Sequence, residues 1–282
     1  MKIAITGAGG QLGRDLIRVL GPVHELLPYT RQQLDVRDEE AVVRLIVETQ
    51  PDVVIHAAAY TQVDQAEGHP EDAYMINSYG TRNVALAAQK AGAKMVYIST
   101  DYVFDGTKEG LYSESDRTNP LSIYGKSKLH GEKFVEIACE RFYIVRTSWL
   151  YGKHGNNFVK KVLELAGKQP SLTMVSDQYG SPTYTYDLAL FVAELICTDL
   201  FGVYHASNRG SCSRYEFAQE ILRAAEINGV TLKPVSAAAF SLPAARPDNS
   251  AFDDTAIRNS GLTRIRDWKS ALHDFICNDL ER

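Results

Sequence analysis

Short runs of consecutive apolar residues alternate along this chain with longer segments in which apolar residues recur every three or four positions. Four of the runs are rich in β-branched residues and apolar almost throughout, at 2–6, 52–57, 94–100 and 142–147. A strand buried on both faces of a parallel sheet has this pattern. A weaker run at 24–30 fits a second strand, so we expect five strands in the first half of the chain.

Segments with helical spacing separate these runs, at 11–20, 39–49 and 71–91. Asp38 is a candidate N-cap for the second segment, and Gly92 occupies a C-terminal capping position after the third. Because strand and helix alternate, the connections should be right-handed crossovers, and the fold class should be α/β with a doubly wound parallel sheet.

The rhythm changes after about residue 150, where helical segments mix with short strands at 172–177 and 202–207 and with proline-containing loops. The helical segments expected there are 157–167, 184–197, 213–226 and 268–280. We expect one domain over residues 1–150 and a smaller α/β lobe over 151–282, with a boundary that the chain crosses more than once.

Composition excludes several classes of protein. The 282 residues are 45% hydrophobic and 23% charged, and the net charge of −5 argues against nucleic acid or an anionic membrane as the main partner. The four cysteines are scattered, which predicts neither a disulfide framework nor a zinc site. The sequence MKIAIT enters a strand directly and no apolar run approaches ~20 residues, so we expect a cytoplasmic protein without a signal peptide or membrane span.

A glycine-rich turn follows the first strand and opens a helix. Gly7, Gly10 and Gly13 form a GxxGxxG frame there. A pyrophosphate needs close backbone approach and free N–H donors at a helix N-terminus, so the context favours a dinucleotide site over a purely structural βα turn.

The end of the second strand bears on which dinucleotide binds. It carries Thr30 and Arg31 in place of the acid that holds an unmodified adenosine ribose, which favours NADP(H); a solvated surface arginine is the alternative. Asp35 lies where a carboxylate could accept from an adenine amino group. The alanines at 57–59 allow close approach of a cofactor, or else only tight packing.

Tyr124 and Lys128 lie one helical turn apart, so they share a helix face. A nearby cation should lower the pKa of a phenol toward the range useful for acid–base catalysis, and the same ammonium can donate to a ribose hydroxyl. The alternative is an amphipathic helix with a solvated cationic face. Thr100 and Asp101 end the fourth strand, at the sheet edge where ligands bind. The hydroxyl of Thr100 is a candidate partner for Tyr124 at that edge.

In combination these motifs resemble the extended short-chain dehydrogenase/reductase superfamily, and within it the dTDP-4-dehydrorhamnose reductase family. The resemblance covers residues 7 to 254. The stretches that carry it are GAGGQLG, AAAYTQVDQAE, STDYVFDG, NPLSIYGKSKLHGE, RTSWLYG, GNNFVK, DQYGSPT and ARPDNSAFD.

This resemblance implies a Rossmann-type fold with a substrate lobe, and NAD(P)H-dependent reduction of the C4 keto group of dTDP-4-dehydro-L-rhamnose to dTDP-L-rhamnose, the last step of dTDP-rhamnose biosynthesis. Tyr124 would be the general acid, Lys128 its tuner and ribose ligand, and Thr100 the hydroxyl that orients the carbonyl. The residues implied to line NADPH, or NADH if it is also used, are Gly10, Gln11, Leu12, Asp35, Val36, Ala59, Tyr60 and Thr61. The residues implied to contact the nucleotide-sugar are Thr100, Asp101, Val63, Trp149, Gln178 and Arg246.

Other readings stay open at this point. An epimerase or dehydratase of the same superfamily is one, although dehydratases usually carry an Asp-Glu pair where Asp101 is followed by Tyr102. A cofactor-binding regulatory subunit without turnover is another. Some relatives form homodimers through magnesium held by carboxylates, and no such cluster can be matched here, so no metal ligand is assigned. Trp149 could be a core aromatic, and Arg246 a loop cation at the surface.

Overall fold

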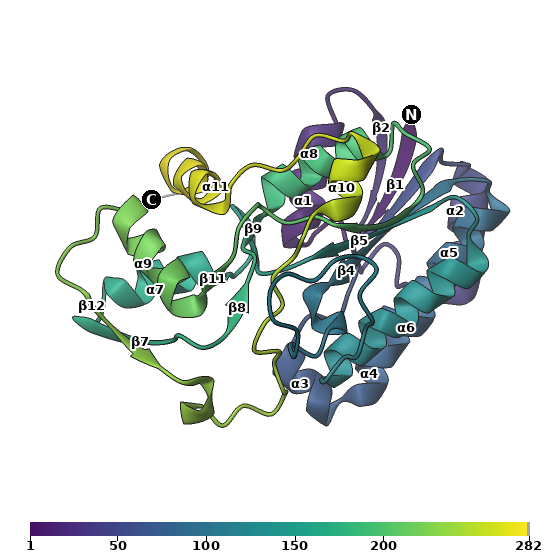
Figure 1. Cartoon of the computed structure of the whole chain (residues 1–282). Helices are drawn as coiled ribbons and strands as arrows, with labels where there is room; N and C mark the ends of the chain where they lie inside the picture. The colour runs from purple at the N-terminus through teal and green to yellow at the C-terminus, as the bar shows by residue number, and fades with distance from the viewer. Residues whose placement is uncertain (281–282) are drawn as a thin grey trace.

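A six-stranded, fully parallel sheet forms the centre of the molecule in this computed structural model, which describes residues 1–280 (Figure 1). The strand order is β10-β5-β4-β3-β1-β2. The strands are β1 Lys2–Thr6, β2 Glu25–Tyr29, β3 Val53–His56, β4 Lys94–Thr100, β5 Phe142–Thr147 and β10 Gly202–His205. The five strands expected in the first half of the chain and the doubly wound α/β class are confirmed. The run at 202–207, expected in the smaller lobe, instead extends this sheet beside β5.

Helices cover both faces of the sheet, and alternate residues of each strand face different layers. Ile3 and Ile5 pack into one apolar cluster with α1 and α8, whereas Ala4 between them packs into the other with α2 and α5. Burial on both faces explains why the strands read as continuous apolar runs. The helices of the first layer are α1 Gln11–Leu20, α8 Thr185–Leu195 and the short α10 Thr255–Ser260, and those of the second are α2 Glu39–Thr49, α5 Thr81–Lys90 and α6 Ile123–Ala138.

The expected helix ends are present. Asp38 caps α2 by accepting from the backbone N–H of Ala41 at 3.0 Å, and Gly92 follows α5 with a φ of +67°. The segment expected as one helix at 71–91 is three: α4 Pro70–Tyr74, the π-helical turn η1 Met75–Gly80, and α5. A further short helix, α3 Val63–Gly68, precedes them.

The smaller lobe packs around an aromatic core that includes Tyr151, Phe217 and Phe275, on the left of Figure 1. Its helices are α7 Phe158–Ala166, α9 Arg214–Ala224, α11 Trp268–Asp274 and the π-helical η4 Phe275–Asp279. Its paired strands are β7 Ser171–Val175 with β12 Thr231–Val235, β6 Leu150–Tyr151 with β9 Thr183–Tyr184, and β8 Tyr179–Gly180 with β11 Cys212–Ser213. The single-turn 3₁₀ helices are η2 Asp101–Val103 and η3 Ala237–Ala239.

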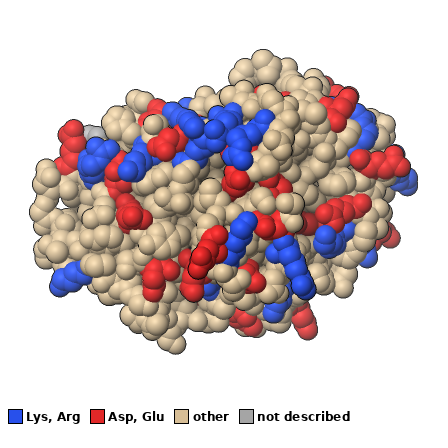
Figure 2. Space-filling model, viewed as in Figure 1, with Lys and Arg blue, Asp and Glu red and all other residues tan. Residues whose placement is uncertain are grey.

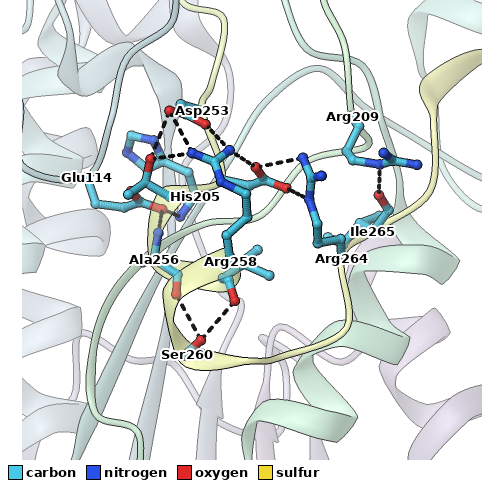
Figure 3. Close-up of polar contacts among 12 residues, drawn as sticks. Glu114, His205, Arg209, Asp253, Ala256, Arg258, Ser260, Arg264 and Ile265 are labelled. Atoms are coloured by element: carbon cyan, nitrogen blue, oxygen red, sulfur yellow. Dashed lines mark hydrogen bonds and ion pairs between the residues drawn. The ribbon is translucent and has the colours of Figure 1, made fainter.

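The surface mixes acidic and basic side chains. Figure 2 shows Lys and Arg gathered over α10 and the segment that leads to α11. In that region Arg258 donates to Asp253 and to Asp254, and Arg264 donates to Asp254 through Nε at 2.8 Å (Figure 3). Because neighbouring carboxylates neutralise these cations, the region is not a free positive patch that would attract a nucleic acid. Across residues 1–280, no helix combines the length and apolar character needed to cross a bilayer.

Candidate active site

A cavity of about 790 Å³ opens at the carboxyl ends of the central strands. It brings together the glycine-rich turn after β1, the alanine run after β3, the end of β4 and the face of α6. The predicted site residues that line it are Gly7, Gly10, Gln11, Leu12, Gly13, Arg31, Asp35, Val36, Ala59, Tyr60, Thr61, Val63, Thr100, Asp101, Tyr124, Lys128 and Trp149. Ligands of open α/β sheets bind at this edge.

The glycine turn has the geometry that a phosphate cradle requires. Gly7 has a φ of +72°, and a Cβ atom there would lie 2.5 Å from the backbone nitrogen of Ala58. A Cβ on Gly13 would collide with the carbonyl oxygen of Gly7. The N-cap of α1, Gly10, provides no side-chain cap, so the first N–H groups of this helix remain available to an anion. The residues present therefore fit a dinucleotide.

The adenosine end of the cavity carries Arg31, which is exposed and borders the cavity. Asp35 accepts two hydrogen bonds from Nε of Arg37, at 3.0 and 3.1 Å, and this guanidinium holds the pKa of Asp35 below its ordinary value. Thr30 does not border the cavity; its hydroxyl donates to Gln33 Oε1 at 2.9 Å. Of the two residues expected to select NADP(H), the structure thus brings only Arg31 to the site.

Asn77 supports the cavity wall from the π-helical turn η1, a role that no sequence motif indicates. Its side-chain oxygen accepts from the backbone N–H of Tyr60 at 2.7 Å, and its amide nitrogen donates to the carbonyl of Tyr60 at 3.1 Å. The same nitrogen donates to Ser127 Oγ on α6 at 3.0 Å. Asn77 therefore fixes the loop after β3 relative to the helix that carries Tyr124.

Tyr124 and Lys128 lie on one face of α6, as their spacing predicts, and both border the cavity. The Lys128 ammonium donates to the carbonyl oxygen of Ile98 at 2.6 Å and lies 4.1 Å from the ring centroid of Tyr97. Burial lowers the pKa of Lys128 to about 7. Burial likewise raises the pKa of Tyr124 well above its ordinary value, so the lowering of the phenol pKa by Lys128 is not seen in this arrangement.

A buried ion pair lies behind the face of α6 that carries Tyr124 and Lys128. Glu132, one turn beyond Lys128 on α6, accepts from Arg146 Nε of β5 at 2.9 Å and from its terminal nitrogen at 2.7 Å. Ser99 of β4 also donates to Glu132, at 2.5 Å. The group therefore joins α6 to two central strands at the level of Lys128. In the sequence, the only sign of this ion pair was the position of Glu132, four residues after Lys128 and so on the same helix face.

Thr100 and Asp101 meet Tyr124 at the end of β4. Thr100 Oγ1 donates to Asp101 Oδ1 at 3.1 Å, and both residues line the larger cavity together with Tyr124. Ser250, from the far end of the chain, donates to Asp101 Oδ2 at 2.6 Å. Asp101 is 2% exposed, and burial raises its pKa from 3.8 to about 6 despite these hydrogen bonds.

The raised pKa of Asp101 predicts a pH-dependent stability difference. In the folded state Asp101 binds its proton more tightly than in the unfolded chain, so its contribution to stability is full below about pH 4 and is lost as pH rises through about 6. The difference from the ordinary value corresponds to about 3 kcal/mol. Asp101→Asn should therefore gain up to about 3 kcal/mol in unfolding free energy relative to wild type on going from pH 4 to pH 8.

Denaturant unfolding of both proteins at the two pH values measures this gain, because pH-independent effects of the substitution cancel. The matched control is Asp199→Asn, an exposed carboxylate paired with Lys94 at 2.9 Å, whose pKa is lowered. Between the same two pH values, Asp199→Asn should instead lose unfolding free energy relative to wild type, because a lowered pKa makes the carboxylate stabilising at the higher pH. If Asp101→Asn showed no relative gain at pH 8, the buried carboxyl would not carry the stated penalty.

A smaller cavity of about 200 Å³ adjoins the first and shares Tyr102, Trp149 and Arg214 with it. Two predicted substrate residues, Gln178 and Arg246, border it, together with the apolar side chains of the smaller lobe. The remaining lining residues are Phe158, Thr173, Met174, Val175, Phe240, Leu242, Pro247 and Ser250. The six predicted substrate residues thus lie along one continuous pair of cavities.

Trp149 and Arg246 are both held in place. Trp149 has a φ of +46°, and its ring packs so closely on Gly180 that a Cβ at Gly180 would collide with it. Arg246 donates to both oxygens of Asp64 on α3, at 3.0 and 2.7 Å, which lowers the pKa of Asp64. The guanidinium expected to meet a diphosphate is therefore already paired with a carboxylate.

Arg214, at the start of α9, is a second arginine of the cavities and was not anticipated. Its guanidinium carbon lies 3.4 Å from the ring centroid of Trp149. Within residues 1–280 no carboxylate forms an ion pair with it, although Asp101 and Tyr102 lie close enough to act on its charge. The capping box of Ser213 and Glu216 fixes the helix start that carries it. Arg214 is thus a cation in the cavity available to an anionic ligand.

The described residues offer no set of ligands suited to a magnesium ion. The described residues contain no group of three or more His, Cys, Asp or Glu side chains placed to hold a metal ion. We therefore assign no step and no ligand to a metal.

Comparison with known proteins gives a consistent result. The family model described as the RmlD substrate binding domain matches residues 1–280. The chain is 41% identical over 276 residues to the spore coat polysaccharide biosynthesis protein SpsK of Bacillus subtilis, covering 98% of this chain and 96% of that protein. It is 39% identical over 284 residues to the dTDP-4-dehydrorhamnose reductase of Aggregatibacter actinomycetemcomitans, covering 96% and 97%. The crystal structure of dTDP-4-dehydrorhamnose reductase from Bacillus anthracis in complex with NADP matches with a TM-score of 0.95 and 45% identity, covering 97% and 98%.

Proposed function

We propose that this chain, which belongs to the family described as the RmlD substrate binding domain, uses Tyr124, Lys128 and Thr100 to reduce the C4 keto group of its nucleotide-sugar. The protein is an NADP-dependent oxidoreductase with a Rossmann-type fold. It catalyses the reduction of dTDP-4-dehydrorhamnose to dTDP-L-rhamnose in dTDP-rhamnose biosynthesis. The observation that carries the assignment of roles is the meeting of these three side chains at the cavity whose glycine turn fits a dinucleotide.

When bound, NADPH supplies a hydride to C4 of the sugar. The N-terminus of α1 would hold its pyrophosphate, and Lys128 would donate to the nicotinamide ribose. Tyr124 would donate a proton to the carbonyl oxygen as the hydride arrives, because the developing alkoxide needs that proton to become a neutral alcohol. Thr100 would hydrogen-bond the same oxygen and so hold the carbonyl in line with the phenol.

Substrate recognition would fall to the two adjoining cavities. Arg214 could pair with the diphosphate through parallel hydrogen bonds, and its stack on Trp149 fixes the plane of the guanidinium. Arg246 would reach the same group only by exchanging Asp64 for phosphate oxygens. The apolar residues of the smaller cavity, with Gln178 as a polar partner, would receive the remainder of the nucleotide. Residues 1–150 would then serve mainly the cofactor and the later residues mainly the substrate.

The test is oxidation of NADPH by the purified protein with dTDP-4-dehydrorhamnose, followed by identification of the sugar product. A stoichiometric conversion to dTDP-L-rhamnose supports the assigned chemistry. An epimerase or dehydratase would turn over its substrate without net loss of NADPH. A regulatory subunit would bind NADPH and show no turnover.

Cofactor preference gives a separate prediction. Arg31→Ala should weaken NADPH binding by about fivefold, because an exposed cation that meets a phosphate contributes about 1 kcal/mol or less, and should leave NADH binding unchanged. Fluorescence titration of both cofactors measures the ratio. The control is Arg44→Ala, an exposed arginine of α2 that does not border the cavity. Equal NADPH affinity in wild type and Arg31→Ala would mean that Arg31 is a solvated surface cation and does not contact the cofactor.

The compartment and assembly are part of the same proposal. All four cysteines are free, which suits the reducing cytoplasm. A homodimer is proposed from the superfamily resemblance, and sedimentation velocity with and without a magnesium chelator tests it. A monomer under both conditions would remove the dimer from the proposal.

A further inference from the structure

Three consecutive residues of β4 hold the face of α6 that carries Lys128. The Lys128 ammonium lies over the ring of Tyr97, 4.1 Å from the ring centroid, and donates to the carbonyl oxygen of Ile98 at 2.6 Å. Ser99 donates to Glu132, one turn further along the helix. Lys128 is 2% exposed and Tyr97 is fully buried, so little water weakens the contact between the cation and the ring.

The plane of the Tyr97 ring is fixed from several sides. Its hydroxyl donates to the carbonyl oxygen of Lys128 at 3.2 Å and lies 3.4 Å from that of Asn77. A Cβ atom on Gly131 would collide with the same hydroxyl, so glycine at this position lets α6 approach the ring closely. The imidazole of His56 stacks on the ring with 5.7 Å between centroids. The ring therefore presents a fixed face to the ammonium.

The groups around Lys128 act in different ways on its charge. Burial lowers the pKa of Lys128 to about 7, whereas the negative charge of Glu132 acts in the opposite direction. His56 of β3 is a neutral ring, because burial lowers its pKa to about 3. Tyr97 is a neutral phenol, because burial raises its pKa well above the ordinary value. Tyr124, on the same face of α6, has a raised pKa for the same reason and is neutral too.

Tyr97 favours the charged form of Lys128 without being a counterion. Glu132 is paired with Arg146 of β5 at 2.7 Å, so part of its charge is already neutralised. An aromatic face attracts a cation through its quadrupole, and the attraction is strongest where water is excluded. An aliphatic side chain in place of Tyr97 would bury the ammonium against alkyl carbon, which disfavours the charged form.

We propose that Tyr97 is a positioning residue of the reaction, whose ring keeps the Lys128 ammonium charged and directed toward the cavity. This inference rests on the proposed function of Lys128 as the donor to the nicotinamide ribose. An ammonium has several N–H donors, and one of these is used on Ile98, which leaves the others for the cavity that Lys128 borders. Tyr97 borders neither of the two cavities, so it acts through Lys128.

The direct test replaces Tyr97 by phenylalanine and then by phenylalanines that carry increasing numbers of ring fluorines. Fluorine withdraws electron density from the ring face and changes the shape of the ring little, so the attraction should weaken step by step. Tyr97→Phe keeps the face and should leave the pKa of Lys128 close to wild type. The most fluorinated ring should lower that pKa by about one unit. Nuclear magnetic resonance of lysine labelled at Cε measures the titration in the free protein, with Lys128→Met for assignment.

Cofactor binding as a function of pH tests the consequence for the site. NADP is used, since it carries the same riboses as NADPH and is stable in mild acid. In Tyr97→Leu the affinity at about pH 7 should fall by about two- to fivefold, because less of Lys128 is charged. At about pH 5 Lys128 is charged in both proteins, and the difference from wild type should vanish. Comparing the two proteins cancels the titration of the cofactor's own phosphate, whose second pKa is about 6.

Tyr143→Leu is the matched control for Tyr97→Leu. Tyr143 is a fully buried tyrosine of the neighbouring strand β5, and it borders neither cavity. The same volume of side chain is lost, yet the ratio of NADP affinities to wild type should not depend on pH. The KM for the sugar nucleotide should stay close to wild type in Tyr97→Phe and Tyr97→Leu, and thermal unfolding verifies that each variant is folded.

Two results would overturn the role of Tyr97. One is a titration of Lys128 that stays in place across the fluorinated series. The other is a loss of NADP affinity in Tyr97→Leu that is equal at all pH values, which would make Tyr97 a packing residue only. A wild-type protein without reductase activity would instead contradict the proposed function, while the titration of Lys128 would still decide its contact with Tyr97. The two failures are therefore distinguishable.

Discussion

Tyr124→Phe should lower kcat by ~10²–10⁴-fold while NADPH binding and thermal stability stay close to wild type. The phenolic hydroxyl is the only group removed, and the ring that packs edge-on against Tyr102 at 5.5 Å between centroids is retained. Steady-state kinetics with dTDP-4-dehydrorhamnose, alongside a titration of NADPH, measure the two effects separately.

Tyr79→Phe is the matched control, because Tyr79 is 43% exposed on η1 and lies outside both cavities. It should keep the wild-type kcat. A Tyr124→Phe protein that retained most of its turnover would show that another group donates the proton. Loss of NADPH binding in the same variant would point to a structural role for the phenol.

Arg214→Ala should raise KM for the sugar nucleotide by about 10- to 100-fold, because a hydrogen bond to a charged group contributes about 1.5–3 kcal/mol. The binding constant of NADPH should change little, since the predicted phosphate cradle of the cofactor lies at the N-terminus of α1. Binding of dTDP, measured by calorimetry in wild type and variant, isolates the contribution of the diphosphate from that of the sugar.

Two other arginines serve as comparisons for Arg214. Arg223 is on the same helix and is paired with Glu220, so Arg223→Ala should leave KM unchanged. Arg246→Ala also removes a cation from the smaller cavity, but this cation is already neutralised by Asp64, so its effect on dTDP binding should be the smaller of the two. A larger effect at Arg246 than at Arg214 would mean that the Asp64 pair opens and that Arg246 is the main phosphate ligand.

The local pattern of apolar residues and glycines was sufficient to predict much of the fold. Burial on both faces makes a parallel strand continuously apolar, so β1, β3, β4 and β5 were visible as runs in the sequence. The glycine turn was equally visible, because a strained backbone conformation leaves glycine as the suitable residue. The i, i+4 spacing placed Tyr124 and Lys128 on one face of α6 because that face depends only on helix geometry.

Residues that act through tertiary contacts could not be found in this way. Asn77 reaches Tyr60 from a π-helical turn, and no local residue preference predicts that turn. Arg214 lies at a helix start that the capping box of Ser213 and Glu216 makes readable, yet its stack on Trp149 depends on how α9 packs in the smaller lobe. The expected effect of Lys128 on Tyr124 failed for a related reason, since spacing gives proximity and says nothing of the burial that shifts both pKa values.

The return of the chain to the central sheet has a consequence for how the protein can be divided. The apolar cluster on one side of β1 is completed by Leu188 and Val192 of α8, and by Ile257 of α10. The outer edge of β5 is covered by β10. A fragment cut at residue 150 would therefore expose part of the sheet's apolar face and an unpaired strand edge, which favours aggregation. We therefore expect the two lobes to unfold as one cooperative unit, with a single transition instead of two.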